Sequence, residues 1–186
     1  MAGSPFYTGR GDDGSTGLLG PGRVPKYDPR PETYGTVDEA QAAMGLARAA
    51  GCTPGAGQVI LAVQRQLYTL MAEVAAAGQA GSPFAGSVTA AHVEQLEGWL
   101  AEFGQAVDMP MEFVVPGDSA PGAALHLART VVRRAERWAA RLADDGFLGN
   151  DQVVRYLNRL SSLLFVLALY EDQAGGAQVP TLAREP

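Results

Sequence analysis

The residues best suited to chemistry in this sequence are five arginines within thirteen positions, from Arg129 to Arg141. At about 100° per residue of a helix, Arg129, Arg133 and Arg137 project from one narrow sector, with Glu136 among them. Like charges four residues apart repel each other, so this cluster costs stability unless it faces an anion. Guanidinium groups form paired hydrogen bonds with phosphate or carboxylate. We therefore expect an anionic partner here, with a merely solvated charged face as the alternative.

The same helical wheel sorts the neighbours of these arginines. His126 falls in the arginine sector, whereas Leu127 falls among the apolar residues on the opposite side. His126 and His92 are far apart and lack the carboxylate spacing of a metal site. A surface or packing role is therefore expected for both histidines.

A glycine-rich segment near the N-terminus is the second candidate for chemistry. Residues 8–17 read TGRGDDGSTG, and backbone amides beside glycine can approach a ligand closely because glycine has no Cβ. Asp12 and Asp13 are suited to holding Mg²⁺ through its water shell. The spacing of the glycines matches a dinucleotide fingerprint, but no strand precedes it and no βαβ unit follows, so a Rossmann site is excluded.

Composition alone leaves a flexible linker as an equal alternative for residues 8–17. Lys26 favours a binding role, because it is the only lysine beside thirteen arginines. A chain that otherwise uses arginine has a compact ammonium at this position, and such a group suits phosphate.

These candidate residues lie on two regions of different composition. Residues 1–35 contain eight glycines, five prolines and one alanine, whereas the remaining residues contain thirty alanines. Glycine and proline interrupt regular structure, while alanine is the best helix former. The sequence therefore predicts a glycine-rich arm at 1–35, a helical body at 36–174 and a frayed C-terminal tail at 175–186.

The body is predicted to be all-α, as a five-helix antiparallel bundle joined by short loops. Thr36 and Glu39 have the spacing of a capping box and predict the start of the first helix. Asn150 is the expected cap of the last helix. Residues 109–117 contain two prolines and predict an extended connector, and no strand of convincing length is found. The expected helices are 36–50, one that follows a turn at 53–55 and ends near 77, 88–107, 119–142 and 151–174.

The chain as a whole excludes several classes of protein. A length of 186 residues fits one domain, and a formal net charge of −6 argues against nucleic-acid binding. A single cysteine, Cys52, excludes a disulfide framework and a cysteine-based zinc site. The longest apolar run, 163–170, is too short to span a membrane, and the N-terminus lacks the features of a secretory signal. A soluble, cytoplasmic protein without a membrane segment is expected.

Three blocks, in order along most of the chain, resemble the signatures of the PduO-type ATP:cob(I)alamin adenosyltransferases. The first block comprises TGRGDDGSTGLLG at 8–20, RVPK at 23–26 and YGTVDE at 34–39. The second comprises FVVPGDS at 113–119 and LHLARTVVRRAER at 125–137, and the third comprises YLNRLS at 156–161 and LLF at 163–165.

The resemblance implies a five-helix bundle that assembles as a homotrimer with active sites between subunits. It implies transfer of the 5′-deoxyadenosyl group of ATP to Co(I) of a corrinoid, with release of triphosphate and assistance by Mg²⁺. ATP and cobalamin are then substrates. A flavin-dependent reductase and an adenosylcobalamin-dependent mutase are the partners that this chemistry implies.

The resemblance also implies roles for individual residues. Arg133, Glu136 and Arg137 would be catalytic, with Glu136 also next to the metal. Phe113 would lie beside the corrin and help exclude its lower axial base. Arg129 would pair with Asp38 across the subunit interface. The implied ATP-binding residues are Thr8, Gly9, Arg10, Gly11, Asp12, Gly14, Ser15, Thr16, Gly17, Lys26, Arg133, Arg134, Ala135, Glu136, Arg137 and Asn158.

Five positions depart from the family pattern. The family usually has Lys or Arg and then Thr at Gly9 and Arg10, and Asn at Gln41. It has Gly at Asp118 and Asp at Ser162. Asp118 adds a negative charge beside the expected corrin loop, and Ser162 removes a carboxylate that would orient an arginine.

These departures motivate a second hypothesis, a catalytically impaired homologue that binds, delivers or senses cobalamin. Without the resemblance, a helical scaffold whose arginine face docks an acidic protein is the third.

Overall fold

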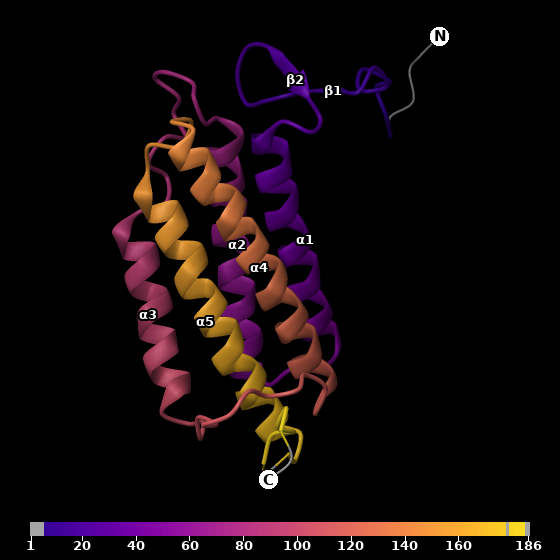
Figure 1. The fold of residues 1–186 in the computed structure, drawn as a ribbon, viewed down its shortest axis with the longest axis vertical. Coiled ribbons are helices and arrows are strands. Elements are labelled where there is room, and N and C mark those ends of the chain that lie inside the picture. The colour runs from indigo at the N-terminus through magenta and orange to yellow at the C-terminus, as the bar shows by residue number, and fades with distance from the viewer. Residues whose placement is uncertain (1–5, 178, 185–186) are drawn as a thin grey trace.

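The computed structural model describes residues 6–177 and 179–184, which form five helices and a two-stranded hairpin (Figure 1). Successive helices run in opposite directions, so the predicted all-α antiparallel bundle is confirmed. The helices are α1 (Pro29–Ala49), α2 (Pro54–Ala75), α3 (Ala90–Gly104), α4 (Ala120–Asp144) and α5 (Asp151–Ala174), and the strands are β1 (Ser15–Gly17) and β2 (Arg23–Pro25).

The starts of α4 and α5 are set by polar caps. Ser119 Oγ accepts a hydrogen bond from Gly122 N at 2.9 Å, and Asn150 Oδ1 accepts one from Gln152 N at 3.1 Å. Each cap satisfies an amide that has no partner within the helix. The predicted cap at Asn150 and the predicted start of α4 are confirmed.

The predicted start of the first helix at Thr36 is wrong. Helix α1 begins at Pro29, where Asp28 caps it by accepting a hydrogen bond from Arg30 N at 3.0 Å. Proline suits the first helical position because its fixed φ is already helical and its missing N–H is not needed there. Thr36 lies about two turns inside the helix. Its hydroxyl donates to the carbonyl oxygen of Glu32 at 2.7 Å.

The arm contains a hairpin that the sequence pattern did not predict. Strands β1 and β2 pair antiparallel, with Thr16 opposite Val24. Each strand has three residues, which is too short for alternation to be visible in the sequence. The hairpin stands at the end of the bundle where α1 begins (Figure 1).

The prediction of a frayed C-terminal tail is wrong at 181–183, which pair with the connector, while 178, 185 and 186 lie outside the described residues. Val115 N donates to Thr181 O at 2.7 Å, and Ala183 N donates to Phe113 O at 2.7 Å. Val114 and Leu182 form an antiparallel bridge between these two bonds. Because the connector is not helical, it has free backbone groups, and the tail pairs with them.

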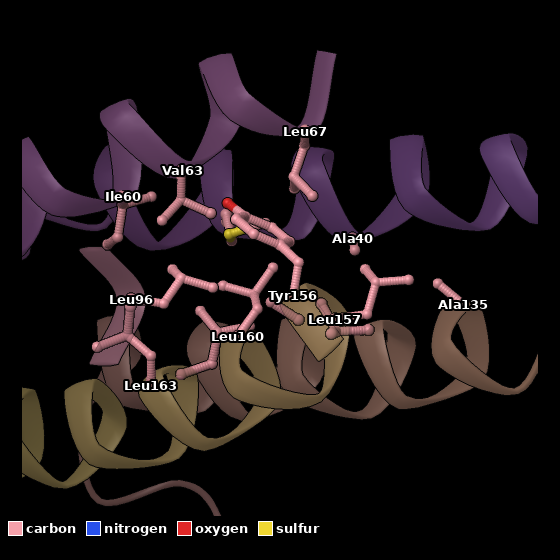
Figure 2. Close-up of a cluster of buried hydrophobic side chains, with 14 of the residues drawn as sticks. Ala40, Ile60, Val63, Leu67, Leu96, Ala135, Tyr156, Leu157, Leu160 and Leu163 are labelled. Atoms are coloured by element: carbon pink, nitrogen blue, oxygen red, sulfur yellow. The ribbon is translucent and has the colours of Figure 1, made fainter. Parts of the chain in front are cut away.

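Helix α5 lies at the centre of the core. Leu157, Leu160 and Leu163 are fully buried, and they meet Leu67 of α2 and Leu96 of α3 (Figure 2). By length and composition α5 would qualify as a membrane span, but 61% of its most apolar window is buried inside the bundle. Its apolar character is therefore explained by core packing.

Helices α1 and α4 pack through small side chains. Ala40, Ala43 and Ala47 of α1 are buried, as are Ala128 and Ala135 of α4. Alanines let two helix backbones approach closely. This contact fixes α4, and with it the direction in which its arginines project.

Candidate active site

Three arginines of α4 form one face, and two others are paired elsewhere. Arg137 Nη1 donates to the carbonyl oxygen of Arg133 at 3.0 Å, while the Arg133 guanidinium has no hydrogen bond or ion pair within the described chain. Arg134 instead forms an ion pair with Glu39 of α1, and Arg141 pairs with Asp145, the residue that follows α4. The stripe of Arg129, Arg133 and Arg137 is therefore the part free to receive an anion.

Glu136 and Asn158 join this stripe to α5. Asn158 Nδ2 donates to Glu136 Oε1 at 2.8 Å, and Asn158 Oδ1 accepts from Arg159 Nη1 at 2.7 Å. Arg159 is itself held by Glu97 of α3 at 2.8 Å. The network orients the amide of Asn158, and it joins two residues that the resemblance implies for ATP binding, Glu136 and Asn158. Arg159 and Glu97 were not predicted, because the only signal was an arginine beside Asn158.

His126 is buried instead of lying with the arginines at the surface. It is 3% exposed, whereas Leu127 is 51% exposed, so the wheel placed both residues wrongly. Helix α4 is covered by α1 on one side and α5 on the other, which buries a wider sector than a single apolar stripe. The His126 ring packs edge-on against Phe165 of α5, with ring centres 5.8 Å apart. The expected packing role of His126 is confirmed.

The surroundings of His126 favour the neutral ring. Burial lowers its pKa, and the positive charge of Arg129 lowers it further, while Asp172 and Asp118 act in the opposite direction. Neither ring nitrogen has a hydrogen-bond partner among the described residues. The neutral ring therefore acts mainly as a packing partner of Phe165.

Two clefts meet at Arg129 and Phe165. The first, of about 470 Å³, is also lined by Arg133 and Ser162. The second, of about 390 Å³, is also lined by Phe113, whose side chain is 85% exposed. The guanidinium carbon of Arg129 lies 5.8 Å from the centre of the Phe165 ring, so these two side chains separate the clefts.

Arg129 is the most constrained arginine of the stripe. Burial, and then the like charge of Arg133, lower its pKa. Its Nε atom is buried and has no hydrogen-bond partner in the described residues. Asp38, the partner that the resemblance implies, is exposed on α1 and forms no ion pair with Arg129 in the described part of this chain. That contact stays a prediction for the assembled protein.

In the arm, a single arginine shapes the glycine-rich loop. Arg23 Nε donates to Ser15 Oγ at 2.8 Å, and its Nη2 donates to the carbonyl oxygens of Arg10 and Ser15. Asp13 Oδ1 accepts from Ser15 N and Oγ at 2.9 and 2.7 Å, and these bonds lower the pKa of Asp13. Arg23 belongs to the first signature block, but the sequence did not indicate this role.

Lys26 contacts the same loop. Its N–H donates to Gly14 O at 2.9 Å, and a Cβ added at Gly11 would lie 3.2 Å from Lys26 Nζ. A side chain at position 11 would therefore crowd the ammonium, which would have to move by a few tenths of an ångström. Lys26 thus lies beside the glycine loop, and a phosphate bound by this loop would meet a positive charge.

The remaining implied residues divide between these two places. The arm carries Thr8, whose hydroxyl accepts from Arg10 N at 3.3 Å, and Gly9, Asp12, Thr16 and Gly17. Ala135 is fully buried, so its side chain faces the core and offers nothing to a ligand. No hydrogen bond or ion pair joins residues 7–35 of the arm to the α4 stripe within the described chain. The arm and the stripe are therefore separate groups of candidate residues within one chain.

The carboxylates of the described residues decide whether the protein alone could hold a metal ion. No group of three or more His, Cys, Asp or Glu side chains able to hold an ion exists among the described residues. Asp13 is engaged with Ser15, whereas Glu136 is a carboxylate on the same helix as the free guanidinium of Arg133. Mg²⁺ commonly binds through one or two carboxylates, water and substrate phosphates. This site fits an ion that arrives with a polyphosphate.

Comparison with known proteins is consistent with this geometry. The family model described as cobalamin adenosyltransferase matches residues 6–171. A cobalamin adenosyltransferase of Cupriavidus metallidurans is 38% identical over 183 residues, covering 98% of this chain and 96% of the relative. The corrinoid adenosyltransferase PduO of Salmonella typhimurium is 36% identical over 167 residues, covering 90% of this chain. The chain spans about half (49%) of the length of that second relative.

A solved structure has the same fold. It is a variant of the PduO-type ATP:corrinoid adenosyltransferase from Lactobacillus reuteri, complexed with cobalamin and ATP. The two superpose with a TM-score of 0.87 at 29% sequence identity, over 97% of this chain and 99% of the other.

Proposed function

The chain belongs to the cobalamin adenosyltransferase family, and on this basis we propose that it transfers the 5′-deoxyadenosyl group of ATP to Co(I) of a corrinoid, releasing triphosphate. The observation that carries the proposal is the free guanidinium of Arg133, which lies beside the Glu136–Asn158 pair and lines the first cleft, while Arg129 lines both clefts. This arrangement offers a polyphosphate site and an adjoining space for a large apolar ring system.

The chemistry requires positioning more than it requires a reactive side chain. Co(I) is the nucleophile, so a cobalt–carbon bond forms at C5′ while the bond from C5′ to the triphosphate oxygen breaks. The electron pair of that bond leaves with the triphosphate. The protein must align C5′ with the cobalt and stabilise the departing charge. Arg133 and Arg137 would do the second task.

Glu136 would hold Mg²⁺ together with the phosphates. When bound, the ion neutralises charge on the triphosphate and makes it a better leaving group. The hydrogen bond from Asn158 orients Glu136 at 2.8 Å and keeps one of its oxygens in a fixed direction. Arg133 and Arg137 then meet the phosphate oxygens that the metal leaves free.

Phe113 would contact the corrin at the second cleft. Its exposed ring offers an apolar surface at this cleft, which would help to exclude the lower axial base. Loss of an axial ligand makes the cobalt easier to reduce to Co(I), because that ligand donates electron density. A flavin-dependent reductase would supply the electron, and an adenosylcobalamin-dependent mutase would use the product.

A homotrimer would bring the two halves of the site together. Leu46 of α1 and Leu127 of α4 are 58% and 51% exposed, and with Val131 they line a depression of about 300 Å³. Exposed apolar side chains gathered on one face are typical of a protein interface. The arm of one subunit would then cover the arginine stripe of the next, and Arg129 would pair with Asp38 across the interface. We place the trimer in the cytoplasm.

An impaired homologue that binds, delivers or senses cobalamin is the second candidate. The observation in its favour is Ser162, which lines the first cleft beside Arg129 and Arg133 and offers no carboxylate to orient them. This candidate expects corrinoid binding with weak or absent binding of ATP.

An absorbance assay tests the proposal. The protein is incubated with chemically reduced cobalamin and Mg²⁺, with and without ATP, and adenosylcobalamin is followed by its visible spectrum. We expect product only when ATP is present. Calorimetry with ATP and with cobalamin runs in parallel. Corrinoid binding without ATP binding or product would replace adenosyl transfer by the second candidate.

A further inference from the structure

The loop before α4 contains an acidic side chain that holds the C-terminal segment in place. Asp118 Oδ1 accepts a hydrogen bond from Thr181 Oγ1 at 2.6 Å, and Asp118 Oδ2 accepts one from Thr181 N at 2.8 Å. The side-chain bond and then the backbone bond lower the pKa of Asp118. The carboxylate is therefore ionised at neutral pH and acts as a charged acceptor, which forms stronger hydrogen bonds than a neutral one.

These two bonds extend a short ladder between the connector and the tail. Thr181 O accepts from Val115 N, and Phe113 O accepts from Ala183 N, each at 2.7 Å. The ladder is only one bridge long, and so short a pairing is marginal on its own in water. Asp118 adds two bonds at one end of it and so holds the tail in register.

The ladder lies directly behind one of the clefts. Phe113 and Val114 line the 390 Å³ cleft that Arg129 and Phe165 close from the helices. The carbonyl that Ala183 engages belongs to Phe113 itself. The position of the tail thus sets the backbone from which the exposed Phe113 ring projects.

Asp118 is attached to a rigid part of the bundle. The next residue, Ser119, caps α4 by accepting from Gly122 N at 2.9 Å. Its hydroxyl also donates to Asp172 of α5 at 2.6 Å, and Asp172 is 4% exposed. The carboxylate of Asp118 therefore stands at a fixed point, and the tail is the part that it positions.

We propose that Asp118 is a positioning residue for the corrinoid cleft. Its two hydrogen bonds with Thr181, called the latch below, fix the cleft wall at Phe113 before the substrate binds. The inference rests on the proposed function, because it takes the cleft to be the corrinoid site. A preformed wall raises affinity since less ordering is required on binding. Asp118 touches no reacting atom in this scheme, and it acts on corrinoid affinity without acting on ATP.

The experiment compares Asp118→Ala with the control Asp108→Ala. Asp108 lies in the same segment between α3 and α4, and its exposed carboxylate has no polar partner within the described residues. Hydrogen exchange reports the amides of Val115 and Ala183, and calorimetry reports cobalamin and ATP binding separately. In Asp118→Ala we expect faster exchange at both amides and a Kd for cobalamin raised about fivefold. The Kd for ATP and the melting temperature should stay at wild-type values, and Asp108→Ala should match wild type throughout.

A cycle with Thr181 tests whether the two side chains act through each other. Thr181→Val removes the hydroxyl, whereas Thr181→Ser keeps both hydrogen bonds and should behave as wild type. The double variant Asp118→Ala, Thr181→Val should weaken cobalamin binding no more than Asp118→Ala alone. The reason is that the two substitutions remove the same side-chain contact. Fully additive losses would show that the two side chains act independently, which contradicts the latch.

Other outcomes separate the inference from the proposed function. Cobalamin affinity unchanged in Asp118→Ala would overturn the inference, as would equal weakening of ATP and cobalamin. Failure of the wild-type protein to bind cobalamin would overturn both. Because binding is measured without turnover, a wild type that binds cobalamin but forms no adenosylcobalamin contradicts the proposed activity alone, and the latch is still decided by the affinities.

Discussion

Arg133 is the side chain on which the proposed stabilisation of triphosphate depends most. Its guanidinium is exposed and has no partner within the described residues, so nothing in the folded chain competes with a ligand. Arg133→Ala should lower kcat/KM at least about 100-fold, the usual effect of removing one donor that meets developing charge. The rate of adenosylcobalamin formation measures this loss.

The matched control is Arg65→Ala. Arg65 is an exposed arginine of α2 without a polar contact in the described chain, so its removal should leave the rate and the stability unchanged. An Arg133→Ala enzyme as fast as wild type would exclude the arginine stripe from the mechanism.

His126 predicts a dependence of stability on pH. Because burial and then Arg129 lower its pKa in the folded chain, the unfolded chain binds more protons than the folded one below about pH 6.5. The contribution is fully present above that pH and is lost as the pH falls toward 5. The melting temperature of the wild type should fall over this range, and that of His126→Leu should fall less. Parallel curves for the two proteins would contradict this account.

At the scale of elements, the buried acids at the end of α5 hold the starts of other helices. Glu171 is 2% exposed, and its carboxylate accepts from Thr53 N at 3.0 and 3.1 Å and from Thr53 Oγ1 at 2.7 Å. Glu171→Ala would leave the amide at the start of α2 without its partner. We expect a loss of about 2 kcal/mol in the free energy of unfolding, measured in urea.

Glu94→Ala serves as the comparison for that prediction. Glu94 is exposed on α3 and has no polar contact in the described residues. Its removal should change the free energy of unfolding by less than about 0.5 kcal/mol. Equal stabilities of the two variants would mean that the contact between α5 and α2 contributes nothing.

The arm makes a prediction that concerns one substrate only. Lys26 lies close above Gly11 in the glycine loop, where its ammonium would meet a phosphate of ATP. Lys26→Ala should raise the KM for ATP about tenfold, the effect of losing one charge-assisted hydrogen bond. The KM for the corrinoid, measured in the same assay, should not change. A parallel rise of both constants would exclude a specific role in ATP binding.

The starts of two helices were predictable because the residues that cap them act on nearby amides. Ser119 and Asn150 act on amides within their own first turn, so their positions alone predicted where α4 and α5 begin. Thr36 has the same local pattern, but Asp28 followed by proline starts the helix earlier and leaves Thr36 inside it. A cap pattern is informative only when no stronger start precedes it.

Contacts between distant segments were not predictable from the sequence. The tail pairs with the segment before α4 through Thr181 and Asp118, which are 63 positions apart. No local sequence pattern predicts such a pairing. His126 shows the same limit, because its burial is decided by Phe165 of α5. The stripe of Arg133 and Arg137 was predictable, because it depends only on helical spacing.

At the scale of the whole molecule, the separation of the arm from the stripe within one chain predicts that sites are shared between subunits. Sedimentation should give a trimer, and Leu127→Asp, which places a charge on the apolar face of α1 and α4, should give a monomer with little activity. A wild-type monomer with full activity would contradict shared sites.

Mixing two impaired variants tests the sharing directly, with ATP kept well below its wild-type KM so that the tenfold higher KM of Lys26→Ala lowers the rate about tenfold. Lys26→Ala has an impaired arm and an intact stripe, and Arg133→Ala has the reverse. If each site takes its arm from one subunit and its stripe from the next, random trimers of equal parts contain about a quarter of fully wild-type sites. Activity of the mixture, after the subunits have been denatured and refolded together, should therefore rise to about a quarter of the wild-type rate. If arm and stripe served one site within the same chain, the mixture would show only the average of the two variants, because no site would then combine an intact arm with an intact stripe.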